Sequence, residues 1–200
     1  MPMTTLRTFI AIELDDKLRN SLGRLQDQLR EQVVPGSVRW VRPEGIHLTL
    51  KFLGDTPLEK VENVKAALAQ AAAEVGPFAF SLAGLGCFPS TRQPNVVWVG
   101  LQEPTGALTR LRDAVEAVVA PLGFPTENRP FKPHLTLGRV QRYGSRQQAS
   151  AARGVGEVVA VTTIGTIGEM TVHTVSYIQS DLKPSGAVYT TLLEARLEGA

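Results

Sequence analysis

Hydrophobic and polar positions along this chain follow two periodicities, one typical of strands and the other typical of helices. Residues 7–13 alternate and favour β-branched and aromatic side chains, whereas apolar residues recur at helical spacing through 14–29, 58–75 and 105–122. Residues 144–156 are polar and interrupted by glycines, so their pattern assigns no element. Further strands are expected at 38–41, 46–53, 78–85, 96–101, 169–179 and 188–197, with a proline-bearing loop at 89–94.

Strands and helices are interspersed throughout the sequence, which predicts an α+β fold. No stretch has the length or composition of a flexible linker, so residues 1–200 are expected to form a single bilobal domain. The content of 43% hydrophobic and 20% charged residues is ordinary for a globular protein. No apolar run is long enough to span a bilayer, and no association with a membrane is expected.

A nine-residue pattern occurs twice and is the most informative feature of the sequence. Residues 42–50 read RPEGIHLTL, and residues 129–137 read RPFKPHLTL. One HLTL alone would be weak evidence, because any half-buried strand alternates in this way. Two copies, each placed after a helix and a proline-bearing turn, indicate a duplicated unit with pseudo-twofold symmetry.

Strand geometry predicts where the polar side chains of the two copies point. Successive side chains of a strand face opposite sides, so His47 and Thr49 share one face while the leucines of the motif share the other. His134 and Thr136 repeat this arrangement in the second copy. If the leucines are buried in the two lobes, both histidine and threonine pairs line one cleft between two sheets.

The motifs and their surroundings resemble a known family. The paired HLTL segments resemble the HxTx motifs of the 2H phosphoesterase superfamily, and RTFIAIEL, HLTLKFLG, LGCFPS, VVWVG and RPFKPHLTLGR are similar to its RNA 2′,3′-cyclic phosphodiesterases, also called the 2′-5′ RNA ligase family. The resemblance extends from Arg7 to about Leu193. It implies two lobes, each a mainly antiparallel sheet with helices outside. One departure is that residues 178–182 read IQSDL, where the family often has an arginine.

The resemblance also implies the roles of the four motif residues. His47 would donate a proton to the departing 3′ oxygen of an RNA 2′,3′-cyclic phosphate, and His134 would accept one from water, leaving a 2′-phosphate. Imidazole suits both tasks because its ordinary pKa lies near neutrality. Thr49 and Thr136 would hydrogen-bond the phosphate oxygens as charge develops. The residues alone leave open which histidine is the acid.

Several other residues near the motifs allow either a functional or a structural interpretation. Arg139 could bind phosphate, but strict alternation places it on the face opposite His134 unless a bulge intervenes. Phe52 and Phe131 could stack on a base, with core packing as the alternative. Arg42 and Arg129 are repeated as well, and we expect them to anchor the turns before the strands.

Composition narrows the remaining possibilities. The formal charge of +2 is too small to indicate a nucleic-acid binder by itself, although Arg139, Arg142 and Arg146 are close together. Cys87 is the only cysteine, which excludes an internal disulfide and suggests a cytoplasmic location. The third histidine, His173, has no carboxylate at metal-motif spacing. We therefore expect no metal and no cofactor, and a monomer whose partner is RNA with a cyclic phosphate end, such as a tRNA fragment.

Three alternative functions fit the same residues. An RNA ligase would run the step backwards with a 5′-hydroxyl in place of water. A non-catalytic module would bind RNA ends without turnover. A phosphodiesterase for small cyclic nucleotides would use the same site with a shorter groove, since fold resemblance does not fix the substrate.

Overall fold

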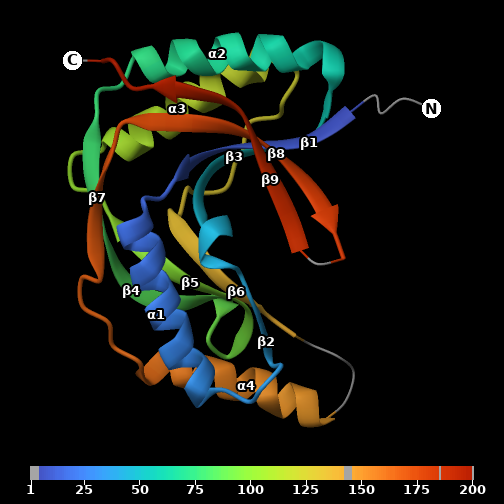
Figure 1. Ribbon diagram of the computed structural model, residues 1–200, viewed down its shortest axis with the longest axis vertical. Coiled ribbons are helices and arrows are strands. Elements are labelled where there is room, and N and C mark those ends of the chain that lie inside the picture. Colours follow the sequence, from blue (N-terminus) through green and yellow to red (C-terminus); the bar gives the residue numbers. More distant parts are fainter. Residues whose placement is uncertain (1–4, 142–145, 185, 200) are drawn as a thin grey trace.

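The computed structural model describes residues 5–141, 146–184 and 186–199, which form two sheets with helices packed against them (Figure 1). The strands are β1 Thr5–Glu13, β2 Val38–Trp40, β3 His47–Pro57, β4 Phe78–Ser90, β5 Gln93–Gln102, β6 His134–Val140, β7 Gly168–Val172, β8 Thr174–Lys183 and β9 Gly186–Arg196. The α-helices are α1 Asp16–Gln32, α2 Val61–Ala73, α3 Ala107–Val119 and α4 Arg146–Val161, with short 3-10 turns at Pro43–Gly45, Leu58–Lys60 and Ala120–Leu122.

The two sheets are antiparallel and lie in different lobes. The first sheet has the strand order β3-β1-β8-β9, and the second has the order β2-β6-β5-β4-β7. Neighbouring strands pair antiparallel in both. This arrangement confirms the predicted α+β class with two mainly antiparallel lobes.

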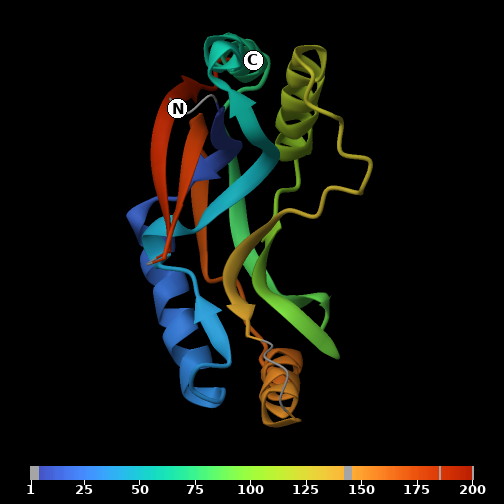
Figure 2. The same ribbon diagram turned by 90° about the vertical axis from the view of Figure 1, so that its right-hand side faces the viewer.

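The helices are exchanged between the lobes. α1 follows β1 of the first sheet but packs near β7 and α4 of the second lobe, whereas α3 follows β5 of the second sheet but packs on α2 and β3. Figures 1 and 2 show α2 and α3 together at one end of the molecule and α1 with α4 toward the other. Apolar residues of both sheets join one continuous core. The two lobes are therefore tied together by their helices as well as by their sheets.

The first helix illustrates why the hydrophobic pattern was a good guide. Asp15 caps the helix by accepting a hydrogen bond from the Leu18 backbone nitrogen at 2.7 Å. Leu18, Leu22, Leu25 and Leu29 recur at helical spacing, and all four are buried. The helix predicted at 14–29 is confirmed, with its bounds shifted to Asp16–Gln32.

Helix α4 is the element that the sequence did not predict. Its buried residues Ala152, Val155 and Val159 do follow helical spacing, but glycines lower the helix propensity of the segment. Gly156 has a packing reason, because a Cβ there would lie 1.8 Å from the carbonyl oxygen of Thr91. The glycine lets α4 approach the β4–β5 hairpin, and this tertiary contact stabilises a helix that local propensity does not favour.

Two further expectations need correction. The single strand expected at 169–179 is two strands, β7 and β8, separated at His173, where the chain passes from the second sheet to the first. The loop expected at 89–94 is a tight hairpin, since β4 and β5 remain paired as far as Ser90 and Gln93. Periodicity alone identified extended backbone in both places but could not show where a strand changes sheet.

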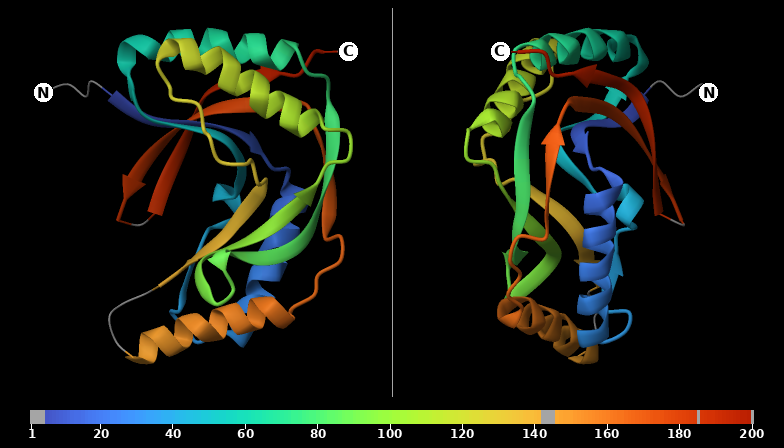
Figure 3. Two further views of the ribbon diagram at one scale, coloured as in Figure 1. Left: turned by 180° about the vertical axis from the view of Figure 1, so that it is seen from behind. Right: turned by 60° about the vertical axis from the view of Figure 1, so that its left-hand side comes forward.

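The strands that begin with the two histidines lie in contact where the lobes meet. β3 is the edge strand of the first sheet, and β6 lies inside the second sheet beside β2. Figure 3 shows β6 near the middle of the molecule, between the helices α2 and α3 at the top and α4 at the bottom. Within the described residues, no helix is long and apolar enough to cross a membrane.

Candidate active site

His47 is the first residue of β3 and is held by three neighbours. Its Nδ1 lies 3.0 Å from the carbonyl oxygen of Gly45. The ring stacks on Phe9 of β1 at 4.6 Å between centroids and meets the edge of Tyr189 of β9 at 5.2 Å. These contacts fix the orientation of the imidazole, and none of them is a hydrogen bond to Nε2.

The surroundings of His47 determine its protonation state. Burial lowers the pKa of His47 from 6.5 to about 4, and the hydrogen bond to Gly45 opposes this shift only in part. The free protein therefore holds His47 as a neutral imidazole at neutral pH. Because a carbonyl oxygen can only accept, Nδ1 carries the proton and Nε2 carries the lone pair.

His134 begins β6 in the same manner. Its Nδ1 lies 2.7 Å from the carbonyl oxygen of Lys132, again two residues earlier in the chain. Phe88 of β4 meets its ring edge-on at 4.8 Å between centroids. Each motif histidine thus has a backbone hydrogen bond that fixes its tautomer and an aromatic ring against it, and in each the carbonyl binds Nδ1 rather than Nε2.

Both threonines lie on the faces predicted for them. Thr49 pairs with Ala11 of β1, and Thr136 pairs with Trp98 of β5; both are half-buried. In the part of the chain that the structure describes, neither hydroxyl makes a hydrogen bond. Each is therefore available to a ligand beside its histidine. The motif leucines are buried on the opposite faces, as predicted.

A β-bulge follows the threonine in each motif. Thr49 and Lys51 pair with the consecutive residues Ala11 and Ile10, which leaves Leu50 as the extra residue. In the second motif the extra residue is Leu137. A bulge reverses the alternation beyond it, so the residues after the two motifs exchange faces.

The first bulge places Phe52 on the same face as His47. Its side chain is 68% exposed and lies 6.1 Å from Phe9 between ring centroids. Core packing was the alternative expected for Phe52, because strict alternation grouped it with the leucines. That alternative is wrong, and the bulge is the physical reason.

The second bulge places Arg139 on the same face as His134 and Thr136. Arg139 pairs with Val96, which alternation along β5 puts on the same side as Trp98, the partner of Thr136. Burial raises the pKa of Tyr189, while the charges of Arg139 and Arg7 act to lower it, so both guanidinium groups lie near the phenol. Tyr189 therefore contacts His47 of one lobe, and its pKa is influenced by the charge of Arg139 of the other.

A buried glutamine supports the second bulge. The side-chain amide of Gln26 in α1 donates to the carbonyl oxygen of Leu137 at 2.8 Å and to that of Val41 at 2.7 Å. The backbone nitrogen of Val41 also donates to Leu137 at 2.9 Å. The Leu137 carbonyl thus accepts two hydrogen bonds, which hold the bulge residue in one conformation.

The first bulge turns Lys51 inward. Its ammonium group lies 2.7 Å from Glu116 of α3, with both side chains 6% exposed, and it also donates to the Pro125 carbonyl. This contact joins β3 to the segment that leads to His134. A pair so deeply buried is retained only where each charge is well partnered.

The remaining residues singled out in the sequence have structural contacts. Phe131 packs against the core, and the guanidinium of Arg112 lies 5.7 Å from its ring centroid. Arg129 binds Glu127 through two nitrogens at 3.0 and 2.6 Å, which holds the pKa of Glu127 near 2. Arg42 begins the 3-10 turn before His47, and its carbonyl accepts from the Gly45 nitrogen.

Other candidates lie elsewhere. Cys87 is buried in β4, which raises the pKa of its thiol to about 11. His173 is exposed between β7 and β8, and no group of three metal-ligating side chains occurs within the described ranges. Arg142 lies outside the described residues, and Arg146 begins α4. In residues 178–182, where the sequence departs from the family pattern, the side chain of Gln179 donates to Asp181 at 3.0 Å.

Phe9, Tyr189 and Gln26 contribute to the site but were not singled out from the sequence. The face of β1 on which Phe9 lies could have been predicted from the alternation along this strand. Tyr189 and Gln26 had none, because their contacts with β3 and β6 depend on how strands and helices distant in sequence pack together.

Comparisons with known proteins place this site in a family context. The family model described as LigT like phosphoesterase matches the chain twice, over residues 12–98 and 99–189, in agreement with an internal duplication. An RNA 2′,3′-cyclic phosphodiesterase of Methanothermobacter thermautotrophicus is 35% identical over 96% of this chain and 99% of its own. A second RNA 2′,3′-cyclic phosphodiesterase, from Archaeoglobus fulgidus, is also 35% identical, over 94% of this chain and 98% of its own.

Solved structures agree with these matches. The crystal structure of TT0787 of Thermus thermophilus superposes with a TM-score of 0.80 at 30% identity, covering 97% of this chain and 99% of that one. Escherichia coli LigT complexed with 3′-AMP gives a TM-score of 0.71 at 26% identity, covering 96% and 98%. Fold and sequence together define an enzyme of the phosphoesterase class. The chain belongs to the LigT-like phosphoesterase family.

Proposed function

We propose that the protein hydrolyses 2′,3′-cyclic phosphates at RNA ends to 2′-phosphates, with His47 and His134 as acid and base. One observation carries the proposal: two equivalent motifs each present an imidazole and a threonine hydroxyl on one face, and within the described residues neither Nε2 nor either hydroxyl makes a hydrogen bond. The curated relatives named RNA 2′,3′-cyclic phosphodiesterase support this substrate.

In the proposed reaction, Nε2 of His134 takes a proton from water as the water oxygen attacks phosphorus. The bond between phosphorus and the 3′ oxygen breaks, and His47 gives its proton to that oxygen. The 2′ oxygen keeps the phosphate. Each proton transfer contributes on the order of 10²–10⁴ in rate when the group is well placed.

Charge on the non-bridging oxygens would be stabilised by Thr49, Thr136 and Arg139. The hydroxyls can donate to the phosphate, and a guanidinium can donate two parallel hydrogen bonds to it. Arg139 becomes a candidate because the bulge at Leu137 turns it toward His134. Such preorganised donors are often the largest single contribution to catalysis.

The lowered pKa of His47 places a condition on its role as proton donor. An imidazole with a pKa of about 4 is neutral in the free enzyme and has no second proton to give. A bound cyclic phosphate carries a negative charge, and a nearby negative charge favours the imidazolium form. Under this proposal, substrate binding itself raises the pKa of His47 and protonates the donor.

Recognition of the terminal base is assigned to Phe52, which presents an exposed aromatic face beside Phe9. Stacking on an aromatic side chain stabilises a single-stranded base by about 1–3 kcal/mol and tolerates any base. Phe131 is a weaker candidate because Arg112 lies over its ring.

The reaction is proposed to need neither metal nor cofactor, since water and two imidazoles account for every proton. We further propose that the protein acts as a monomer in the cytoplasm. The buried Cys87 thiol, whose pKa burial raises to about 11, is suited to remaining reduced there.

The test is turnover of a short RNA ending in a 2′,3′-cyclic phosphate, with the product identified by its phosphate position. We expect the 2′-phosphate, a bell-shaped pH profile, unchanged turnover in EDTA, and a loss of at least about a hundredfold in kcat for His47→Ala and His134→Ala. His173→Ala is the matched control and should retain activity.

The same assay separates the alternatives. A longer product in the presence of a 5′-hydroxyl RNA would indicate a ligase. Full binding with no turnover by the native chain would indicate an RNA-end binding module. Turnover lost in EDTA and restored by zinc or magnesium would contradict the two-histidine reaction.

A further inference from the structure

Two arginines lie directly opposite each other at the edge of the second sheet. Arg39 of β2 pairs with Arg139 of β6, so both side chains leave the sheet on the same face. This is the face of His134 and Thr136. Like charges on directly opposite residues destabilise a sheet unless something of opposite charge lies between or beside them.

No carboxylate in the described residues provides that charge. Both arginines are exposed, and neither takes part in an ion pair or a side-chain hydrogen bond within the part of the chain described here. Four other arginines do have carboxylate partners, whereas some, such as Arg24, make no ion pair in the described ranges either. These pairs are Arg19 with Asp16, Arg30 with Asp27, Arg112 with Asp113 and Glu116, and Arg129 with Glu127.

The strand that carries Arg39 is firmly held at this position. A Cβ at Gly138 would lie 2.5 Å from Val38, so the glycine lets β2 pack closely against β6. The amide of Gln26 binds the Val41 and Leu137 carbonyls just beyond the pair. Arg39 and Arg139 therefore stay adjacent despite their mutual repulsion.

The position of Arg39 relative to the site indicates its ligand. Along β6 the order is His134, Thr136 and Arg139, and Arg39 lies one strand further out at the sheet edge. If the cyclic phosphate lies at the histidines and Arg139, the next negative charge along an RNA strand is the phosphate that joins the last two nucleotides. A guanidinium is well suited to bind it.

We propose that Arg39 binds the internucleotide phosphate immediately 5′ of the cyclic end, so that the enzyme prefers a cyclic phosphate on an oligonucleotide over a cyclic mononucleotide. This rests on the proposed function. The pair Arg39 and Arg139 would then receive two successive phosphates of one strand. Arg7, the other guanidinium near Tyr189, lies in the opposite lobe and is not part of this subsite.

The test compares a cyclic mononucleotide with a trinucleotide ending in a 2′,3′-cyclic phosphate. For Arg39→Gln, kcat/KM on the trinucleotide should fall about tenfold, as expected for the loss of one charge-assisted hydrogen bond, and stay within about twofold on the mononucleotide. The log-log salt slope for trinucleotide binding should shrink by about 0.7, the contribution of one phosphate contact on a single strand. Arg39→Lys should recover part of the loss.

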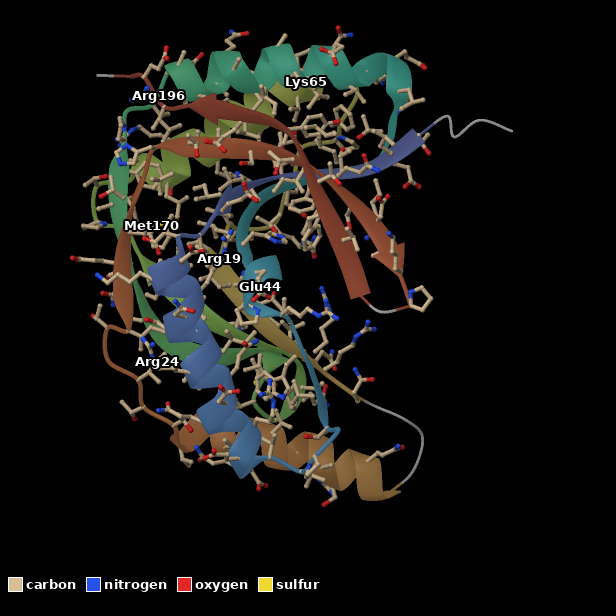
Figure 4. All side chains as sticks on the ribbon, in the orientation of Figure 1. Arg19, Arg24, Glu44, Lys65, Met170 and Arg196 are labelled. Carbon is tan, nitrogen blue, oxygen red and sulfur yellow. The ribbon has the colours of Figure 1, made fainter. Side chains whose placement is uncertain are left out.

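Arg24→Gln is the matched control, because Arg24 is exposed on the outer helix α1 (Figure 4) and makes no ion pair in the described ranges. This variant should leave kcat/KM unchanged on both substrates. Equal losses on both substrates, or none on either, would overturn the subsite. A selective fall in kcat/KM on the trinucleotide for Arg7→Gln but not for Arg39→Gln would also overturn the subsite. That result would instead place the RNA strand along β1.

Failure of the proposed function gives a different result. If the native chain turns over neither substrate, the two-histidine reaction is wrong. The proposed role of Arg39 is then tested by binding measurements alone. Arg39→Gln should still weaken binding of a linear trinucleotide with a terminal 2′-phosphate more than it weakens binding of a nucleoside 2′-phosphate. Equal effects on the two would contradict the subsite.

Discussion

At the scale of single residues, the two histidines share one geometry but differ in their surroundings. Both direct Nδ1 at a carbonyl two residues earlier, which leaves Nε2 for chemistry. His47 is enclosed by Phe9 and Tyr189, whereas among the described residues Phe88 is the one aromatic ring against His134. Enclosure by apolar rings disfavours the charged form of an imidazole, so the chain controls the protonation of His47 by desolvation.

This control can be measured directly by NMR titration of the His47 imidazole. We expect a pKa of about 4 in the free protein. Phe9→Ala exposes the ring to water and should raise the pKa toward its ordinary value, while Phe88→Ala, next to the other histidine, should leave it unchanged.

Binding of an anion provides the second half of the test. A nucleoside 2′-phosphate should raise the pKa of His47, because negative charge favours the imidazolium. A pKa unaffected by the bound phosphate would contradict the role of His47 as proton donor and would favour His134 for that role.

At the scale of elements, the repeated bulge explains what the sequence predicted well and what it did not. Alternation correctly placed both histidine and threonine pairs and buried the leucines. It failed two residues after each motif, at Phe52 and Arg139, because an extra residue in each strand reverses the alternation and nothing in the HLTL text marks it. Strand pairing partners from distant segments impose the bulges, so a local pattern could not reveal them.

Helix α4 and the break between β7 and β8 escaped prediction for a related reason. Gly156 lowers helix propensity but permits contact with Thr91, and His173 marks a change of sheet within one extended run. In each case a tertiary contact outweighs the local preference. The core faces of α1 and the histidine strands were predictable because burial there follows simple periodicity.

The buried pair formed by Lys51 and Glu116 should be sensitive to the loss of one partner. Lys51→Ala removes the closer of the two cations beside the buried Glu116 carboxylate, with Arg112 remaining at 3.5 Å, and should lower the free energy of unfolding by up to about 3–5 kcal/mol. Combining Lys51→Met with Glu116→Leu should recover most of that loss, since an apolar pair of similar volume needs no compensation. Urea denaturation measures the free energy of unfolding of both variants. Lys65→Ala, which removes an exposed ion pair with Glu62, is the control and should lower that free energy by less than about 1 kcal/mol.

At the scale of the whole molecule, two repeats are joined by the exchange of helices between their lobes. The family model matches the chain twice, and each repeat contributes one histidine strand. α1 and α3 each pack in the lobe opposite their preceding strand, so neither lobe has a complete core by itself. Unfolding of either lobe should therefore remove the site entirely.

The buried His47 should also make global stability depend on pH. Its pKa is lowered from 6.5 to about 4, so between these values the unfolded chain binds a proton that the folded chain does not. The contribution is fully present above pH 6.5 and is lost as pH falls toward 4, by up to about 3 kcal/mol. Denaturation midpoints across this range should show a smaller slope for His47→Gln than for the native chain. Equal slopes would contradict the buried neutral imidazole.

The central claim is that imidazoles from the two lobes act on one phosphate, and the most direct measurement is kcat for His47→Ala, His134→Ala and the double variant on one cyclic-phosphate RNA. Groups that act as a unit are not additive. Each single variant should therefore lose nearly all turnover, and the double variant should be no slower than the slower single. Losses that multiply in the double variant, or a single variant within about tenfold of the native rate, would contradict the account.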